Sequence, residues 1–488
     1  MSPHISPHMS PLMNWRPLTA ARSRVVVLAG LCAVAASVFG LSAAAAAAER
    51  DVPLPRREGA APELPSRIEA DPLLPSRIEV DPPLPSRTEG HAAPDLPALV
   101  RALGAIEAAS AVRLARTGID VEEANRQRLQ IGPYEYGVRG FLGQRRDPSQ
   151  RYYDGELVVE RPIRLPAKMR LDHEIGAGGV EIARLALTEA RHESGRLLLA
   201  GWFALAGARA ELALWDDQTA LIEQQLGVVQ GRLRAGDAPR VDLLLAEAAV
   251  AQARQGQAQA RARVQTAAAE LEQTFPSMAD ALPAPLATPR RIDDEESAWQ
   301  ARVLEHNREL LGARAQARQA ERIVERVRAE RRPDPSLGVR YASERSGNEH
   351  VIGVLLSVPL PGAARDAAVT AAIAQARLQA DQVDAIERRV AGEARIAYRA
   401  AQGAWASWAR AEEAAERLTR HAELAARGYT LGEGTLNDVL LARRAANDAR
   451  LAAVATQAKA REAYCRLALD AYRLWPLEDA EIDAVRKR

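Results

Sequence analysis

Three stretches of the chain combine helix-forming residues with a complete lack of proline. They cover residues 167–238, 240–275 and 362–475 and are rich in Ala, Leu, Arg, Glu and Gln, which are strong helix formers. A helix of about 66 residues makes a rod of about 100 Å, which is too long to hide in a compact globule. The pattern predicts two long helical hairpins, which pair residues 175–234 with 239–275 and residues 363–430 with 435–474.

Two shorter regions, residues 132–166 and 333–362, are dense in Gly, Tyr and Val and alternate in places. Ile352, Val354 and Leu356 fall on one strand face, because successive side chains of a strand point to opposite sides. Each region is predicted to form a β-hairpin. The tyrosines suit strands at a membrane–water interface. A soluble hairpin that caps a coiled coil fits the strand pattern equally well.

The two helical turns have similar sequences. Segments 234–254 and 430–450 share eight identical residues in 21 positions, at an offset of 196 residues. Gly236 and Gly432 can take the left-handed conformation that ends a helix. The chain is therefore predicted to be an internal duplication of one unit, made of helix, β-hairpin, long helix, tight turn and helix.

Other residues follow the same repeat. Pro239 suits the first turn of the next helix in the first copy, and Thr435 can cap that helix in the second copy. Trp202 and Tyr398 form an aromatic pair at the same offset of 196 residues. These matches extend the duplication beyond the turns.

The ends of the chain differ from the repeats. A basic start, an apolar run and a row of small residues predict a signal peptide, with a membrane anchor or lipid attachment at Cys32 as alternatives. Pro, Arg and Glu with three LPSR motifs predict a disordered tether. The expected parts are a signal peptide (1–48), a tether (49–97), the first repeat (98–275), an equatorial linker (276–297), the second repeat (298–475) and a C-terminal tail (476–488).

Charge and chemistry exclude several classes of protein. The 65 basic and 64 acidic residues leave a net charge of +1, so the sequence lacks the basic excess that a nucleic-acid partner requires. The eight histidines are scattered, and the sequence has no Walker loop, no nucleophile elbow and no metal-ligand cluster. We expect no catalytic site, no bound metal and no cofactor, and hence no enzyme.

The duplicated helical hairpins, the two β-hairpins that close with a proline and the motif Gly-x-x-x-x-x-Asp-x-Leu at each turn resemble the TolC-type outer-membrane efflux proteins. The strand exit at residues 358–362 resembles the heavy-metal (cobalt–zinc–cadmium) branch. The resemblance implies a mainly α fold with membrane β-hairpins. Duplicated helical hairpins would form a coiled-coil tunnel in the periplasm. Four strands per protomer would contribute to a shared 12-stranded β-barrel of a homotrimer in the outer membrane.

The resemblance also implies a function. The chain would be a passive exit duct of a tripartite efflux system, for heavy-metal cations delivered by an RND-type inner-membrane pump and a periplasmic adaptor. A duct for drugs or for type I protein secretion would use the same tunnel. A periplasmic coiled-coil scaffold or adaptor is the alternative from another class of protein.

Residues of the turns acquire roles through this resemblance. The entrance of the channel would be lined by Asp438 and by its counterpart Asp242, although Leu441 stands where some family members carry a second aspartate. The alternative role of both aspartates is to stabilise the helix dipole from the first turn. The residues expected at the periplasmic tip, in contact with the adaptor, are Gly236, Asp237, Gly432, Glu433 and Gly434.

Overall fold

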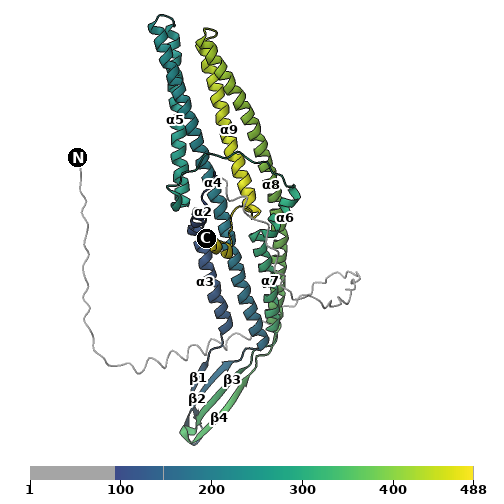
Figure 1. Cartoon of the computed structure of the whole chain (residues 1–488). Coiled ribbons are helices and arrows are strands. Elements are labelled where there is room, and N and C mark those ends of the chain that lie inside the picture. The colour runs from purple at the N-terminus through teal and green to yellow at the C-terminus, as the bar shows by residue number, and fades with distance from the viewer. Residues whose placement is uncertain (1–93, 147, 487–488) are drawn as a thin grey trace, which may run out of the picture. The chain divides into compact units, whose positions relative to one another are not determined.

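The computed structural model describes residues 94–146 and 148–486. The predicted signal peptide and the tether up to residue 93 lie outside the described residues. The described chain is mostly helical and contains one sheet of four strands, which confirms the mainly α fold with two β-hairpins (Figure 1). In Figure 1 the sheet lies at one end of the helices, and the two helical turns lie at the other.

The elements follow the same order in the two halves of the chain. The first half contains α2 (Leu99–Ala108), α3 (Ser110–Ile131), β1 (Gly137–Arg146), β2 (Arg151–Pro162), α4 (Pro166–Arg234), α5 (Arg240–Thr274) and the short 3₁₀ helix η1 (Pro276–Met278). The second half contains α6 (Glu296–His306), α7 (Arg308–Ala329), β3 (Ser336–Glu344), η2 (Arg345–Gly347), β4 (Glu349–Ser357), α8 (Ala363–Thr430), α9 (Leu436–Asp470) and α10 (Asp479–Arg486).

Helix α4 begins at Pro166, earlier than the predicted residue 175. Proline suits the first helical position, because its φ is already helical and its missing N–H needs no partner there. Gly176 and Gly179 lie where α4 passes close to α3. A Cβ at Gly176 would lie 2.9 Å from Cγ of Arg126. These glycines therefore permit close packing within a helix that has already started.

The start of helix α5 also differs slightly from the prediction. Pro239 is the N-cap residue, with an extended ψ of 153°, and the helix starts at Arg240. Proline has no side-chain acceptor for the free N–H groups of the first turn. Helix α5 therefore starts without a side-chain cap.

The end of the predicted tether is wrong, because Asp95 belongs to the folded part. Its side chain is fully buried, and its carboxylate oxygens lie 2.6 and 2.7 Å from the guanidinium nitrogens of Arg461 in α9. Its backbone carbonyl accepts a hydrogen bond of 2.7 Å from Nε1 of Trp202. Buried ionic groups of this kind have to be paired, which fixes this segment against α4 and α9.

The predicted C-terminal tail packs against the helices. Leu477 is buried, and its carbonyl accepts a hydrogen bond from Arg191 in α4. Glu478 forms an ion pair with Arg308 at the start of α7. This segment therefore contacts elements of both halves.

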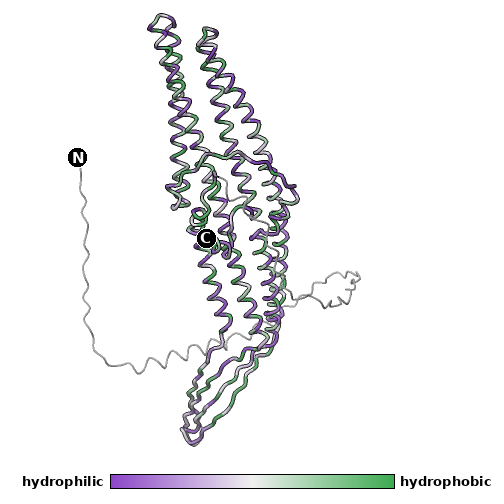
Figure 2. The backbone as a smooth tube through the Cα atoms, in the orientation of Figure 1, coloured by the Kyte–Doolittle hydropathy of each residue, from purple (hydrophilic) through white to green (hydrophobic). Residues whose placement is uncertain are grey.

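The largest cluster of buried apolar side chains lies where the short elements meet the long helices. It includes Ile106 of α2, Trp202 and Phe203 of α4, Leu271 of α5 and Leu469 of α9. Figure 2 shows hydrophobic and hydrophilic residues alternating along the long helices, as expected for helices that pack on one side. The long hairpins are therefore anchored by a core near their middle.

Helix α4 contains one 18-residue window with a mean hydropathy of 1.5, long and apolar enough to cross a membrane by composition alone. A third of that window is buried within the fold. Leu198, Leu199 and Trp202 of α4 belong to the core just described. The apolar composition of α4 thus has a structural role within the fold.

Candidate functional site: the sheet and the two helical turns

The four strands form one antiparallel sheet in the order β1-β2-β3-β4. The hairpins of the two halves join through β2 and β3, where Leu157 pairs with Tyr341 and Val159 with Val339. Strands β1 and β4 lie at the edges, and neither pairs with a further strand of the described residues. Unpaired edges expose rows of N–H and C=O groups, which can pair with the strands of another chain.

One face of the sheet is apolar and exposed. The register places Val138, Leu157, Val339 and Val354 on this face, and all four are exposed. Ile352 and Leu356 extend it along β4, where the structure confirms the predicted alternation. Ile352 and Val354 are 78% and 79% exposed, whereas a soluble sheet normally covers such a face.

The opposite face carries charges that are paired with one another. Arg145 lies 3.0 Å from Asp154 and 3.2 Å from Glu344. Arg340 lies 2.9 Å from Glu156, and Arg139 pairs with Glu160 in the same way. A sheet with one apolar face and one ion-paired face fits a wall between lipid and water.

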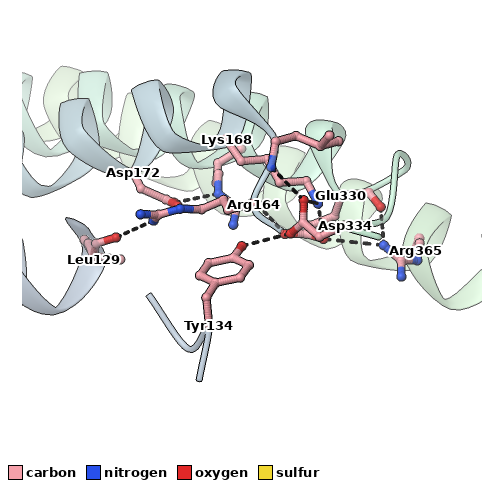
Figure 3. Close-up of polar contacts among 10 residues, drawn as sticks. Leu129, Tyr134, Arg164, Lys168, Asp172, Glu330, Asp334 and Arg365 are labelled. Atoms are coloured by element: carbon pink, nitrogen blue, oxygen red, sulfur yellow. Dashed lines mark hydrogen bonds and ion pairs between the residues drawn. The ribbon is translucent and has the colours of Figure 1, made fainter. Parts of the chain in front are cut away.

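A network of buried charges connects the sheet to the helices (Figure 3). Lys168 of α4 is fully buried, and its Nζ lies 3.0 Å from Glu330 and 3.1 Å from Asp334. Asp334, just before β3, also accepts hydrogen bonds from the hydroxyl of Tyr134 and the backbone N–H of Leu165. The segments before and after the first hairpin thus meet the segment before the second hairpin at one charged centre.

Further arginines complete this network. Arg164, after β2, lies 2.9 Å from Asp172 and donates to the carbonyl of Leu129 at 2.6 Å. Arg326 of α7 binds Asp172 at 2.6 Å, and Arg365 of α8 contacts Glu330. Asp172 of α4 therefore links the segment after β2 to α7.

Hydrogen bonding sets the proton affinity of this network. Burial alone raises the pKa of Asp334, but hydrogen bonds from Leu165, Tyr134 and Lys168 outweigh burial and hold that pKa below its usual value. The pKa of Glu330 is also lowered, because its bonds to Arg326 and Lys168 outweigh its burial. Burial and the bond to Asp334 raise the pKa of Tyr134 to about 12.

The two helical turns share one backbone arrangement. The N–H of Asp237 donates to the carbonyl of Arg232 at 2.9 Å, and the N–H of Glu433 donates to that of Gly428 at 2.8 Å. Gly236 and Gly432 have φ of 77° and 84°, in the left-handed region that the sequence predicted. Each turn is thus a Schellman motif, in which the left-handed residue lets later N–H groups bond to the last helical carbonyls.

The residues predicted at the tips are all exposed. They are Gly236, Asp237, Gly432, Glu433 and Gly434. Asp237 forms an ion pair of 3.0 Å with Arg232, whose guanidinium lies 4.9 Å from the ring centre of Tyr429 in the other hairpin. Sequence reasoning missed this contact between hairpins, because no local pattern reports which side chains meet across a repeat.

The two predicted entrance aspartates differ in their contacts. Asp438 accepts hydrogen bonds from the N–H of Thr435 at 3.0 Å and from its hydroxyl at 2.7 Å, in a capping box at the start of α9. These bonds hold the pKa of Asp438 below its usual value. Asp242 lies in the first turn of α5, which has no such box. Asp438 thus caps its helix, and the capping role of Thr435 is confirmed.

Comparison with known proteins identifies the fold. No protein-family model and no curated protein matches the chain. The outer membrane channel CmeC of Campylobacter jejuni has a TM-score of 0.62 at 14% identity, with 80% of this chain and 88% of that chain covered. The outer membrane protein VceC of Vibrio cholerae has a TM-score of 0.62 at 16% identity, covering 76% and 95%.

The open-state MtrE outer membrane channel of Neisseria gonorrhoeae is similar in the same way. Its TM-score is 0.62 at 16% identity, with 78% of this chain and 90% of that chain covered. The described chain therefore has the fold of these outer membrane channels, which supports the resemblance to the TolC-type family.

Proposed function

We propose that this protein is the outer-membrane channel of a tripartite efflux system, a passive exit duct fed by an RND-type inner-membrane pump and a periplasmic adaptor. The observation that carries the proposal is the sheet, whose exposed apolar face lies opposite a face of paired charges. The strands of 9 to 12 residues match the length that crosses a bilayer.

The open edges support a shared barrel. Only closed barrels and helices satisfy all backbone polar groups in lipid, and four strands with two free edges are not closed. A homotrimer would join three copies of four strands into a 12-stranded barrel, with the ion-paired face inward. The long hairpins would then form the periplasmic tunnel, each about 100 Å in length.

The turns would form the periplasmic tip. Their exposure and rigid backbone support Asp237 and Glu433 as contacts for an adaptor. In this proposal Asp242 and Asp438 line the entrance, and Asp438 also caps its helix. Charge reversal of Asp237 and Glu433 to Lys should reduce adaptor crosslinking and export, whereas the trimer should assemble normally.

The charge reversal of Asp237 and Glu433 tests the contact between the tip and the adaptor better than a charged residue at Gly432 does. Gly432 has a φ of 84°, so any side chain there strains the turn itself. Normal crosslinking and export by the double Lys variant would remove the tip assignment.

Heavy-metal cations are the cargo that we propose, on the resemblance of residues 358–362 to the heavy-metal branch. Drugs and secreted polypeptides are the alternatives for the same tunnel. A strain that lacks the gene should become sensitive to cobalt, zinc and cadmium salts and regain resistance with the intact gene. Sensitivity to drugs alone would leave the duct in place but change its cargo.

The sheet gives the sharpest test of the duct itself. Val354→Arg places a charge on the apolar face, where a charge near the middle of a bilayer costs about 2–4 kcal/mol. Val351→Arg is the matched control, because Val351 lies on the opposite face of the same strand. The full chain should fractionate with the outer membrane and extract as a trimer, and only Val354→Arg should reduce that yield.

Equal yields of the two variants, or a soluble periplasmic monomer or dimer of the natural chain, would contradict the duct. A periplasmic coiled-coil scaffold or adaptor would then be the better reading.

A further inference from the structure

Five exposed arginines lie at the ends of the elements that join the sheet to the helices, or in the segments between them. Two of them end helices that lead into the hairpins, two follow α7, and one ends β2. We call this set the basic collar, and it consists of Arg128, Arg161, Arg328, Arg331 and Arg332. Exposed acidic residues in the same segments are Glu135, Glu325 and Asp366, and Glu325 forms an ion pair of 3.2 Å with Arg322.

Arg161 shows how the collar adjoins the apolar face. The register pairs Arg161 with Leu337, so Arg161 lies on the same face as Val159 and Val339. Its guanidinium lies 4.9 Å from the ring centre of Tyr136, and its Nε donates to the carbonyl of Tyr134 at 2.9 Å. Tyr136 is itself 69% exposed. An arginine and a tyrosine therefore border the apolar surface side by side.

The collar keeps most of its charge available. Asp366 neutralises Arg331 at 2.9 Å. Arg128, Arg328 and Arg332 have no ion pair with any residue in the described ranges. The charges of the buried network are paired with one another, since Lys168 binds Glu330 and Asp334. A surface with spare guanidinium groups next to an apolar band therefore remains.

We propose that the basic collar binds the phosphate groups of anionic phospholipids, in the leaflet that faces the helices. The inference rests on the proposed function, because it takes the apolar face as inserted in a bilayer. Guanidinium groups bind phosphate oxygens through paired N–H donors. Phosphates lie at the border of the hydrocarbon layer, which is where the register places Arg161 relative to Val159 and Val339.

Charge complementarity and continuity select lipid over other anionic partners. A lipid headgroup must lie next to the apolar face of the inserted sheet, so the collar meets it without any further docking step. Each basic residue near an anionic membrane surface is worth about fivefold in binding, and salt screens this attraction. Three unpaired arginines should therefore produce a clear preference for anionic lipid.

The test uses the full chain reconstituted in phosphatidylcholine bilayers with spin-labelled lipids. Electron paramagnetic resonance measures the fraction of labelled phosphatidylglycerol and of labelled phosphatidylcholine that the protein immobilises. We expect the natural chain to prefer phosphatidylglycerol by about fivefold or more at low salt. The preference should fall toward one in the triple variant Arg128→Gln, Arg328→Gln, Arg332→Gln.

Three exposed arginines of α8, far along the chain from the sheet, provide the matched control. The variant Arg410→Gln, Arg417→Gln, Arg420→Gln removes the same charge and should keep the preference. Equal immobilisation of both lipids by the natural chain, or an unchanged preference in the collar variant, would overturn the collar proposal alone. If neither lipid is immobilised, the sheet does not enter the bilayer, and the proposed duct fails with it.

Discussion

The two ends of the helices are stabilised by different kinds of interaction. At the sheet end, Lys168 is fully buried between Glu330 and Asp334, and segments from both halves of the chain meet there. At the turn end, Gly236 and Gly432 set the backbone while the surrounding side chains are exposed. A buried charge depends on its partners, whereas an exposed turn depends on its own φ and ψ. The sheet end should therefore be sensitive to single side chains and the turn end to single backbone positions.

The largest effect should come from Lys168→Met. Removing one partner of a buried ion pair leaves the other charges uncompensated, which costs about 3–5 kcal/mol. Arg170→Met is the control, because Arg170 lies on the same helix and is 64% exposed. Chemical unfolding in detergent should show a large loss for Lys168→Met and a loss within about 1 kcal/mol for Arg170→Met. Similar losses for both variants would refute the difference between buried and exposed charges.

Acid should weaken the sheet end by a smaller amount. The pKa values of Glu330 and Asp334 are lowered in the folded chain. Their contribution is therefore complete above the unfolded carboxyl pKa of about 4, and it is lost as the pH falls through the lower folded values. Unfolding between about pH 6 and pH 2 should show this loss, and the double variant Glu330→Gln, Asp334→Asn should flatten it. The loss should stay below that of Lys168→Met, because protonated carboxyls still hydrogen-bond.

At the turn end, Gly428→Ala should cost about 1–3 kcal/mol. A Cβ at Gly428 would lie 2.8 Å from the backbone carbonyl oxygen of Glu433, which the Schellman motif holds in place. Gly403→Ala is the control on the same helix, because no atom lies within 4 Å of a Cβ there. That control should stabilise α8 slightly, since Ala is the better helix former. Thermal melting followed by circular dichroism distinguishes the two variants, and equal shifts would contradict the steric argument.

The smallest effect should separate the two turns from each other. Thr435→Ala removes the cap of α9 and should cost about 1 kcal/mol. Pro239→Ala removes no side-chain acceptor from α5, so it should not show the loss of stability that comes from removing a cap. The backbone N–H of Asp438 donates to the hydroxyl oxygen of Thr435 at 3.3 Å. Hydrogen exchange of this amide therefore reports the loss of the cap directly. Unchanged exchange in Thr435→Ala would mean that the cap has no role in solution.

The sequence predicted what repeats locally and missed what pairs at long range. Proline-free runs and glycine turns marked the long helices, because helix propensity and φ are properties of single residues. The start of α4 at Pro166 was missed, since Gly176 and Gly179, which allow close packing with α3, interrupt the helix-forming pattern there. The sequence did not predict the network of buried charges around Lys168, because Tyr134 and Asp334 lie 200 positions apart in the chain.

The burial of Asp95 was missed for a related reason. The residue follows a proline-rich segment, and composition alone assigned it to the tether. Its partners, Trp202 and Arg461, lie 107 and 366 positions away. No window of sequence contains both ends of such a contact.

Trp202 and Tyr398, at matching positions of the two halves, make the same kind of hydrogen bond. Nε1 of Trp202 donates to the backbone carbonyl of Asp95, and the hydroxyl of Tyr398 donates to the backbone carbonyl of Asp294. Each ring thus donates to the backbone just before the first helix of its half, α2 in the first half and α6 in the second. The two halves are therefore alike in a hydrogen bond between unlike residue types, which a comparison of identical residues counts as a mismatch.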